Sequence, residues 1–299
     1  MVRPKLLTSA CLEFEKIRYD GQMIPSKIVR DLMPFADFVK VCPEYEIGLG
    51  VPREPVRIVK SGEEYRLIQH GTNKDVTEEM VSFTRSFLNR LEEVDGFIFK
   101  SRSPSMGLSN IKVYSGMKGS PVIGRCNGFF AGEVMERFAD YPIEDEDRLR
   151  NRTIRHHFLT RLFMMAALRE ARGRGDLKGF HTTYGTILRF YNPETASRLD
   201  PKQEEYASRI REMTRHPPSF DGMLRFFKEC KDSVTDTEAY GSLLRRYEDN
   251  RISFETMREG LRLLARDGTF AKDVFFTPYP EELVDEVEQD RGRDYWKSR

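Results

Sequence analysis

The sequence predicts an α/β domain with a mostly parallel sheet, followed by an all-α domain. Residues 4–140 alternate short apolar runs with helical patterns, which is typical of a parallel sheet covered by helices. Beyond about residue 146 the strand patterns end, and amphipathic helical patterns follow one another. The length of 299 residues also fits two domains of ordinary size.

The predicted strands of the first domain are short apolar runs. The run 5–12 is the first strand and carries Cys11 near its end; a short helix then leads to a second strand that ends at Cys42. The runs 55–59 and 65–69 form either a hairpin or two neighbouring strands. Further strands are predicted at 96–100 and 111–116.

Two helices are predicted between and after these strands. Residues 76–93 carry apolar side chains at spacings of three and four, which is the pattern of a helix with one buried face. Residues 128–138 begin another helix after the loop Gly124–Gly128.

The charged, proline-bearing stretch 141–149 predicts a boundary between the domains. We therefore expect an α/β domain at 1–143, a helical domain at 144–285 and a charged tail at 286–299. The helical patterns of the second domain lie at 152–173, 180–191, 201–215, 219–233, 237–249 and 253–267.

Composition narrows the classes of partner and compartment. The 49 basic and 48 acidic residues leave a net charge of +1, so global charge predicts no nucleic-acid or membrane partner. No apolar run approaches the roughly 18–20 residues of a membrane span, and the first residues do not form a signal peptide, so we expect a cytoplasmic protein. Four cysteines are too few for a disulfide scaffold in a chain of this length.

Three short segments end apolar runs with polar or thiol-bearing residues: SACL at 9–12, VCPE at 41–44 and KSRSPSMG at 100–107. The carboxyl ends of parallel strands meet at one edge of a sheet, so these segments are predicted to converge on one site.

Cys11 and Cys42 then become neighbours, and they are either ligands of a soft metal or iron–sulfur cluster, or small core residues. Glu44 is either an acid or base beside that site or an ordinary exposed glutamate. Ser103 and Ser105 either cap the turn or contact a ligand.

These motifs, taken in order, resemble the thiouracil desulfidase family. The matching pattern is SACL-x6-YDG, then CPE-x3-GLGVPREPVRIV, then KSRSPS-x-G, and the similarity spans roughly residues 5–140. The resemblance implies a [4Fe-4S] cluster held by three cysteines, with one iron left open for the sulfur of a thiolated base. The implied reaction is a non-redox desulfidation that yields the oxo base and sulfide.

Carried over residue by residue, the resemblance makes Cys11 and Cys42 cluster ligands. It makes Glu44 the catalytic glutamate and Ser103 the active-site serine. The residues expected to bind substrate are Ser103, Ser105 and Arg53.

The third cysteine of the family pattern is missing, because this chain reads SPSMG where the family reads SPSCG. Cys126, in the predicted loop, is the candidate replacement ligand. The alternatives are loss of the cluster with the fold retained, and ligation by Met106. Ligation by Met106 is the least favoured of the three, because a neutral thioether is a weak ligand for cluster iron.

The helical half resembles a YbgA-like domain of unknown function, through FHTTYGTILRFYNPE (180–194) and FTPYPEEL (276–283). Two functions are therefore open. The first is a desulfidase-like enzyme for a small thiolated base or nucleoside. The second is a non-catalytic, cluster-free descendant that serves as a small-ligand-binding module or as a protein- or RNA-interaction module. An RNA or protein partner would bind through the helical domain.

Overall fold

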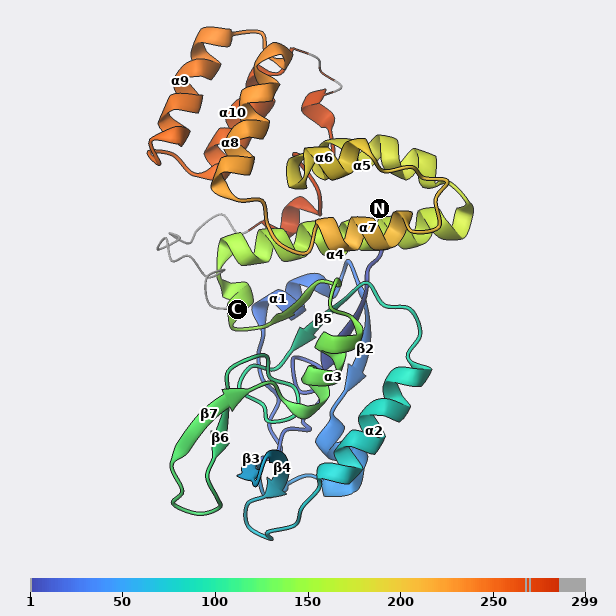
Figure 1. Ribbon diagram of the computed structural model, residues 1–299, viewed down its shortest axis with the longest axis vertical. Helices are drawn as coiled ribbons and strands as arrows, with labels where there is room; N and C mark the ends of the chain where they lie inside the picture. Colours follow the sequence, from blue (N-terminus) through green and yellow to red (C-terminus); the bar gives the residue numbers. More distant parts are fainter. Residues whose placement is uncertain (1, 267, 269, 285–299) are drawn as a thin grey trace. The chain divides into compact units, whose positions relative to one another are not determined.

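The protein is described by a computed structural model over residues 2–266, 268 and 270–284 (Figure 1). The predicted charged tail, 286–299, lies outside the described residues. The chain divides into two compact units. One comprises residues 3–162 and 282–284, and the other comprises Val2 and residues 163–281. The division falls inside the long helix α4 (Arg152–Arg174).

The first unit contains a four-stranded, fully parallel sheet. Its strand order is β2 (Asp37–Val41), β1 (Lys5–Ser9), β5 (Gly96–Phe99) and β8 (Ile143–Asp145). All four residues of β5 and all three of β8 are buried, as expected for strands covered on both faces. The predicted parallel α/β architecture is confirmed in this sheet.

A second, mixed sheet follows the order β4 (Glu64–Gln69), β3 (Val56–Ser61), β6 (Ile111–Tyr114) and β7 (Val122–Cys126). Only β3 and β6 pair in parallel, because β3–β4 and β6–β7 are antiparallel pairs. The first pair confirms the hairpin alternative of the sequence analysis. The predicted loop at 124–128 is wrong in part, since residues 122–126 are a strand. Val122 and Ile123, two consecutive apolar residues of this strand, are both exposed. The alternation of buried apolar and exposed polar residues that marks a strand in sequence is therefore absent.

The α-helices between the strands of the two sheets are α1 (Lys27–Leu32), α2 (Thr77–Arg90) and α3 (Phe129–Arg137). A short π-helix, η1 (Tyr45–Leu49), follows β2, and a 3-10 helix, η2 (Arg148–Arg150), follows β8. Leu88 of α2 and Phe130 of α3 pack in the apolar core over one face of the parallel sheet. Met80, two turns earlier on α2, packs in the separate core of the mixed sheet. The same helix therefore belongs to both cores.

The stretch predicted as a domain boundary instead holds β8, which pairs with β5. Its carboxylates are buried because each has partners. Glu144 accepts a hydrogen bond from Arg148 Nε at 2.8 Å, and Asp145 Oδ1 accepts from the backbone N–H groups of Asp147 (3.0 Å) and Arg148 (2.8 Å). A dense run of acidic residues is normally a solvated segment, so sequence reasoning could not recognise a buried strand here.

The second unit is helical, which confirms the predicted all-α part. After α4, its α-helices are α5 (Leu177–Tyr191), α6 (Pro193–Ser197), α7 (Tyr206–Met213), α8 (Phe220–Glu229), α9 (Thr237–Glu248) and α10 (Phe254–Leu264). Side-chain N-caps begin several of them: Ser219 accepts from the backbone N–H of Gly222, and Ser253 from that of Thr256.

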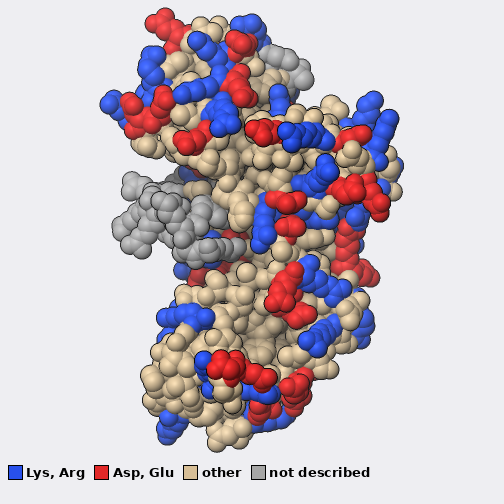
Figure 2. All heavy atoms as spheres, viewed as in Figure 1, with Lys and Arg blue, Asp and Glu red and all other residues tan. Residues whose placement is uncertain are grey.

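Both signs of charge are interspersed on the face that Figure 2 shows, in agreement with the balanced composition. Among the described residues, no helix has the length and apolar character that crossing a membrane requires.

Candidate functional site

A cavity of about 580 Å³ lies at the carboxyl ends of the parallel strands. Cys11 follows β1, Cys42 follows β2, the segment Ser101–Met106 follows β5, and Glu146 follows β8; all of them line the cavity. The three segments predicted to converge therefore do meet at one edge of the sheet. This is the position at which open α/β sheets bind ligands.

Glu44 and Arg53 form a buried ion pair in the cavity wall. Arg53 Nε and Nη2 donate to the same carboxylate oxygen, Glu44 Oε2, at 3.0 and 2.9 Å. The Arg53 side chain is 3% exposed, and its Nη1 also donates to the backbone carbonyls of Ile17 and Gly50, both at 3.0 Å. Glu44 is 7% exposed, which rules out the reading of it as an ordinary surface glutamate. The arginine orients the glutamate and leaves Oε1 for other partners.

The two serines predicted as site residues continue this network. Ser105 Oγ donates to Glu44 Oε1 at 2.8 Å, and Ser103 Oγ lies 3.0 Å from Ser105 Oγ. Ser103 Oγ also accepts from the backbone N–H of Met106 at 3.1 Å. Ser103 thus makes the turn contact foreseen for it and at the same time lines the cavity.

The segment that carries these serines is held by backbone contacts to the start of α3. Gly128 N–H donates to Gly107 O at 2.8 Å, and Phe130 N–H donates to Ser105 O at 2.9 Å. A Cβ at Gly128 would lie 2.6 Å from the carbonyl carbon and oxygen of Ser105, so the close approach requires glycine.

Cys11 and Cys42 line the cavity together with Glu44. The pKa of the Cys11 thiol is raised to about 12, chiefly by burial and then by the nearby Cys42, whereas Lys100 acts in the opposite direction. Burial also raises the pKa of Cys42, and Arg53 opposes this, with Nη2 at 3.5 Å from the sulfur. Both thiols are therefore protonated at neutral pH when no ligand is bound.

Cys126 and Met106 occupy different surroundings. Cys126 ends β7 and packs against the core of the mixed sheet beside Ile111; it does not line the cavity. Met106 does line the cavity, is 3% exposed and belongs to the core of the parallel sheet. The structure thus brings Cys11, Cys42 and Met106 to one cavity and leaves Cys126 outside it.

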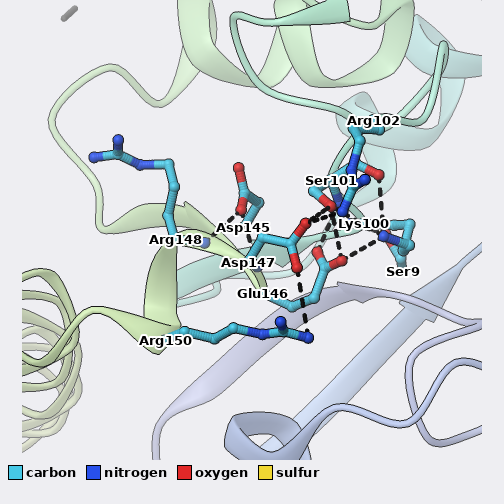
Figure 3. A network of polar contacts seen from close by, with 9 residues as sticks. All are labelled: Ser9, Lys100, Ser101, Arg102, Asp145, Glu146, Asp147, Arg148 and Arg150. Atoms are coloured by element: carbon cyan, nitrogen blue, oxygen red, sulfur yellow. Dashed lines mark hydrogen bonds and ion pairs between the residues drawn. The ribbon is translucent and has the colours of Figure 1, made fainter. Parts of the chain in front are cut away.

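A second polar network in the cavity wall was missed by sequence reasoning (Figure 3). Lys100 Nζ contacts Glu146 Oε1, and Glu146 Oε2 accepts from the backbone N–H of Ser101 at 2.7 Å. Arg102 Nη2 donates to Asp147 Oδ2 at 2.6 Å. The available signal was the acidic run 144–147, which begins inside β8 directly after Ile143, but a strand of three residues is too short to be recognised from sequence.

Burial raises the pKa of Asp147, but hydrogen bonds from Arg102 and Ser101 outweigh it and leave that pKa below its usual range. Glu146 and Asp147 therefore add two carboxylates to the lining of the cavity that holds Glu44, each with a neighbouring cation or hydroxyl.

Comparisons with known proteins find similarity in the part of the chain that holds this cavity. The model of the 2-thiouracil desulfurase family matches residues 6–146. The uncharacterized protein YbbK of Bacillus subtilis (strain 168) is 33% identical over 112 residues, which are 34% of this chain and 72% of YbbK. A solved structure described as the [4Fe-4S]-dependent thiouracil desulfidase TudS is 28% identical, with a TM-score of 0.38, covering 50% of this chain and 94% of TudS.

The match covers the unit that holds the cavity and both sheets. The YbgA-like character of the helical unit, and an RNA or protein partner for it, stay predictions. Through its N-terminal residues, this chain belongs to the 2-thiouracil desulfurase family.

Proposed function

We propose that the cavity binds a small thiolated nucleobase or nucleoside and that the protein is a desulfidase-like enzyme for this ligand. Membership of the 2-thiouracil desulfurase family supports a desulfidase-like role. The observation that carries the proposal is the buried Glu44–Arg53 pair, hydrogen-bonded to Ser105, in the same cavity as Cys42. A volume of about 580 Å³ is also ample for a pyrimidine.

The overall conversion is the replacement of a thiocarbonyl by a carbonyl, in which water supplies the oxygen and sulfide leaves with the two protons. Glu44 is the group that moves these protons, because its Oε1 faces Ser105 while Oε2 is held by Arg53. Ser103 and Ser105 position the base through their hydroxyls, which lie 3.0 Å apart. Arg53 acts on the ligand through Glu44, so we regard it as a positioning residue.

The residues present do not fit the cluster that the family resemblance implies. A [4Fe-4S] cluster of that kind takes three thiolates. The cavity offers two thiols, and at the third position it offers the thioether of Met106. Cys126 packs against the core of the mixed sheet and does not line the cavity. We therefore assign no step of the conversion to a cluster.

Met106 favours a second candidate function, in which the cavity binds the thiolated base without converting it. The polar network of Glu44, Arg53 and Ser105 recognises the ligand in both cases. The two candidates differ only in whether sulfide is released.

The test is calorimetric titration of the full chain with 2-thiouracil, 4-thiouracil and uracil, together with a sulfide assay on the same samples. We expect the thiolated bases to bind more tightly than uracil. For an enzyme, Glu44→Gln should lower sulfide release by about 100-fold or more, as for the loss of an acid–base group. Glu46→Gln is the matched control, because Glu46 is exposed and does not line the cavity.

Each outcome decides one point. Binding with sulfide release supports the enzyme, and binding without it supports the second candidate. Equal affinity for uracil and the thiolated bases, or Glu44→Gln behaving like Glu46→Gln in both assays, contradicts the proposal.

A further inference from the structure

Three sulfur-bearing residues, Cys11, Cys42 and Met106, line the same cavity. Cys42 follows β2, Cys11 follows β1 and Met106 lies in the segment after β5, so they come from three consecutive strands in the order β2–β1–β5. The strand ends are tied together: Ala10 N–H donates to Val41 O at 2.9 Å, and Lys100 N–H donates to Ser9 Oγ at 2.9 Å.

The position of Met106 is set by its backbone. Its N–H donates to Ser103 Oγ at 3.1 Å, and the next residue, Gly107, donates to Ser103 O at 2.8 Å and accepts from Gly128 N–H at 2.8 Å. Residue 106 therefore stays at the cavity wall whichever side chain it carries.

The metal-ligating side chains of this cavity do not fit zinc or a [4Fe-4S] cluster. Zinc takes Cys, His, Asp or Glu ligands. Among the described residues, no three side chains of these types are grouped so that they could hold a metal ion. An iron–sulfur cluster of the family type needs three thiolates, and this cavity has two.

Two thiolates and a thioether are, in contrast, the ligand class that selects a soft monovalent ion such as Cu(I). We propose that Cys11, Cys42 and Met106 bind one ion of the Cu(I) class. Arg53 Nη2, at 3.5 Å from Cys42 Sγ, supports this site by donating to a ligand sulfur. This site is independent of whether the cavity also binds a thiolated base.

The test is anaerobic titration of the full, reduced chain with Cu(I) supplied as its bicinchoninate complex. We expect transfer of one Cu(I) per chain to the protein. Replacing a residue that only hydrogen-bonds to a metal ligand lowers metal affinity by about 10–100-fold. Met106 is proposed as a ligand itself, so Met106→Leu, which keeps the apolar bulk, should weaken Cu(I) binding by at least about tenfold. Cys11→Ser provides a second variant. Cys11 is half-buried, so its position tolerates a serine more readily than a fully buried position would. Cys230→Ala, in the core of the helical unit, is the control and should bind as the parent does.

Equal Cu(I) affinity in the parent, Met106→Leu and Cys11→Ser would overturn the proposal, as would loss of binding in Cys126→Ala.

A second experiment uses iron and sulfide in place of copper. Met106→Cys supplies the third thiolate and should form a brown [4Fe-4S] protein, whereas the parent and the size-matched Met106→Ser should not. A complete [4Fe-4S] cluster in the parent would contradict the proposal, because two thiolates and a thioether would then suffice to hold the cluster. Thiouracil titration of metal-free protein tests the proposed function separately, so the two failures remain distinguishable.

Discussion

Asp145 allows a direct test of how the acidic turn beside the cavity is built. The pKa of this carboxyl is raised from its ordinary 3.8 to about 6, chiefly by burial and also by the neighbouring charges of Glu146 and Glu144. The backbone N–H of Arg148 and its guanidinium oppose it. The folded protein therefore binds the Asp145 proton more tightly than the unfolded chain does.

The sign and size of the effect on stability follow. The stabilising contribution of Asp145 to the free energy of unfolding is fully present below pH 3.8 and is lost as the pH rises through about 6. The gap between 3.8 and about 6 is about 2.2 pH units, and each unit is worth about 1.4 kcal/mol, so the full change is about 3 kcal/mol. Asp145→Asn removes the charge but keeps Oδ1, the atom that accepts both backbone N–H groups of the turn.

The assay is urea unfolding of the parent and of Asp145→Asn at a series of pH values between about 4 and about 7. Other titrating groups act equally on both proteins, so the difference in unfolding free energy isolates Asp145. We expect this difference to shift in favour of the variant by about 3 kcal/mol as the pH rises over that range. A difference that does not change with pH would refute the reasoning.

Two further predictions concern the loop and the thiols. Gly128→Ala should lower the unfolding free energy by about 1–3 kcal/mol, because its Cβ would meet the Ser105 carbonyl at 2.6 Å. Gly132→Ala, one turn on in α3 with 3.6 Å of clearance, should instead stabilise by up to about 1 kcal/mol; equal melting temperatures would contradict the packing described. Lys100→Met should raise the pKa of Cys11 and slow its alkylation by iodoacetamide in metal-free protein, as measured by mass spectrometry. Faster alkylation would mean that Lys100 does not act on this thiol.

The edge of the parallel sheet could be located from the sequence because the rule behind it is geometric. Apolar runs that end in polar turns mark the carboxyl ends of parallel strands, and those ends meet. Cys11, Cys42 and Ser103 were therefore predicted to converge before any contact was known, and they line one cavity in the structure.

The contacts inside the cavity were beyond sequence reasoning. Glu44 and Arg53 are nine residues apart with a short π-helix and a bend between them, and no periodicity indicates that they pair. Glu146 lies in an acidic run whose burial depends on Lys100 and Ser101, 46 and 45 residues earlier in the chain. Cys126 was placed in a loop because the exposed residues of β7 show no strand pattern.

The helix α2 has a consequence for ligand binding. It contributes Met80 to the core of the mixed sheet and Leu88 to that of the parallel sheet, so the two sheets are fixed to one rigid element. The cavity takes Pro55 and Val56 from the mixed sheet's side and Cys11 and Cys42 from the other. We therefore expect the distance between these two sides of the cavity to change little when a ligand binds. A cavity whose walls are already in place loses little free energy to ordering on association, so it would select ligands by their size and shape.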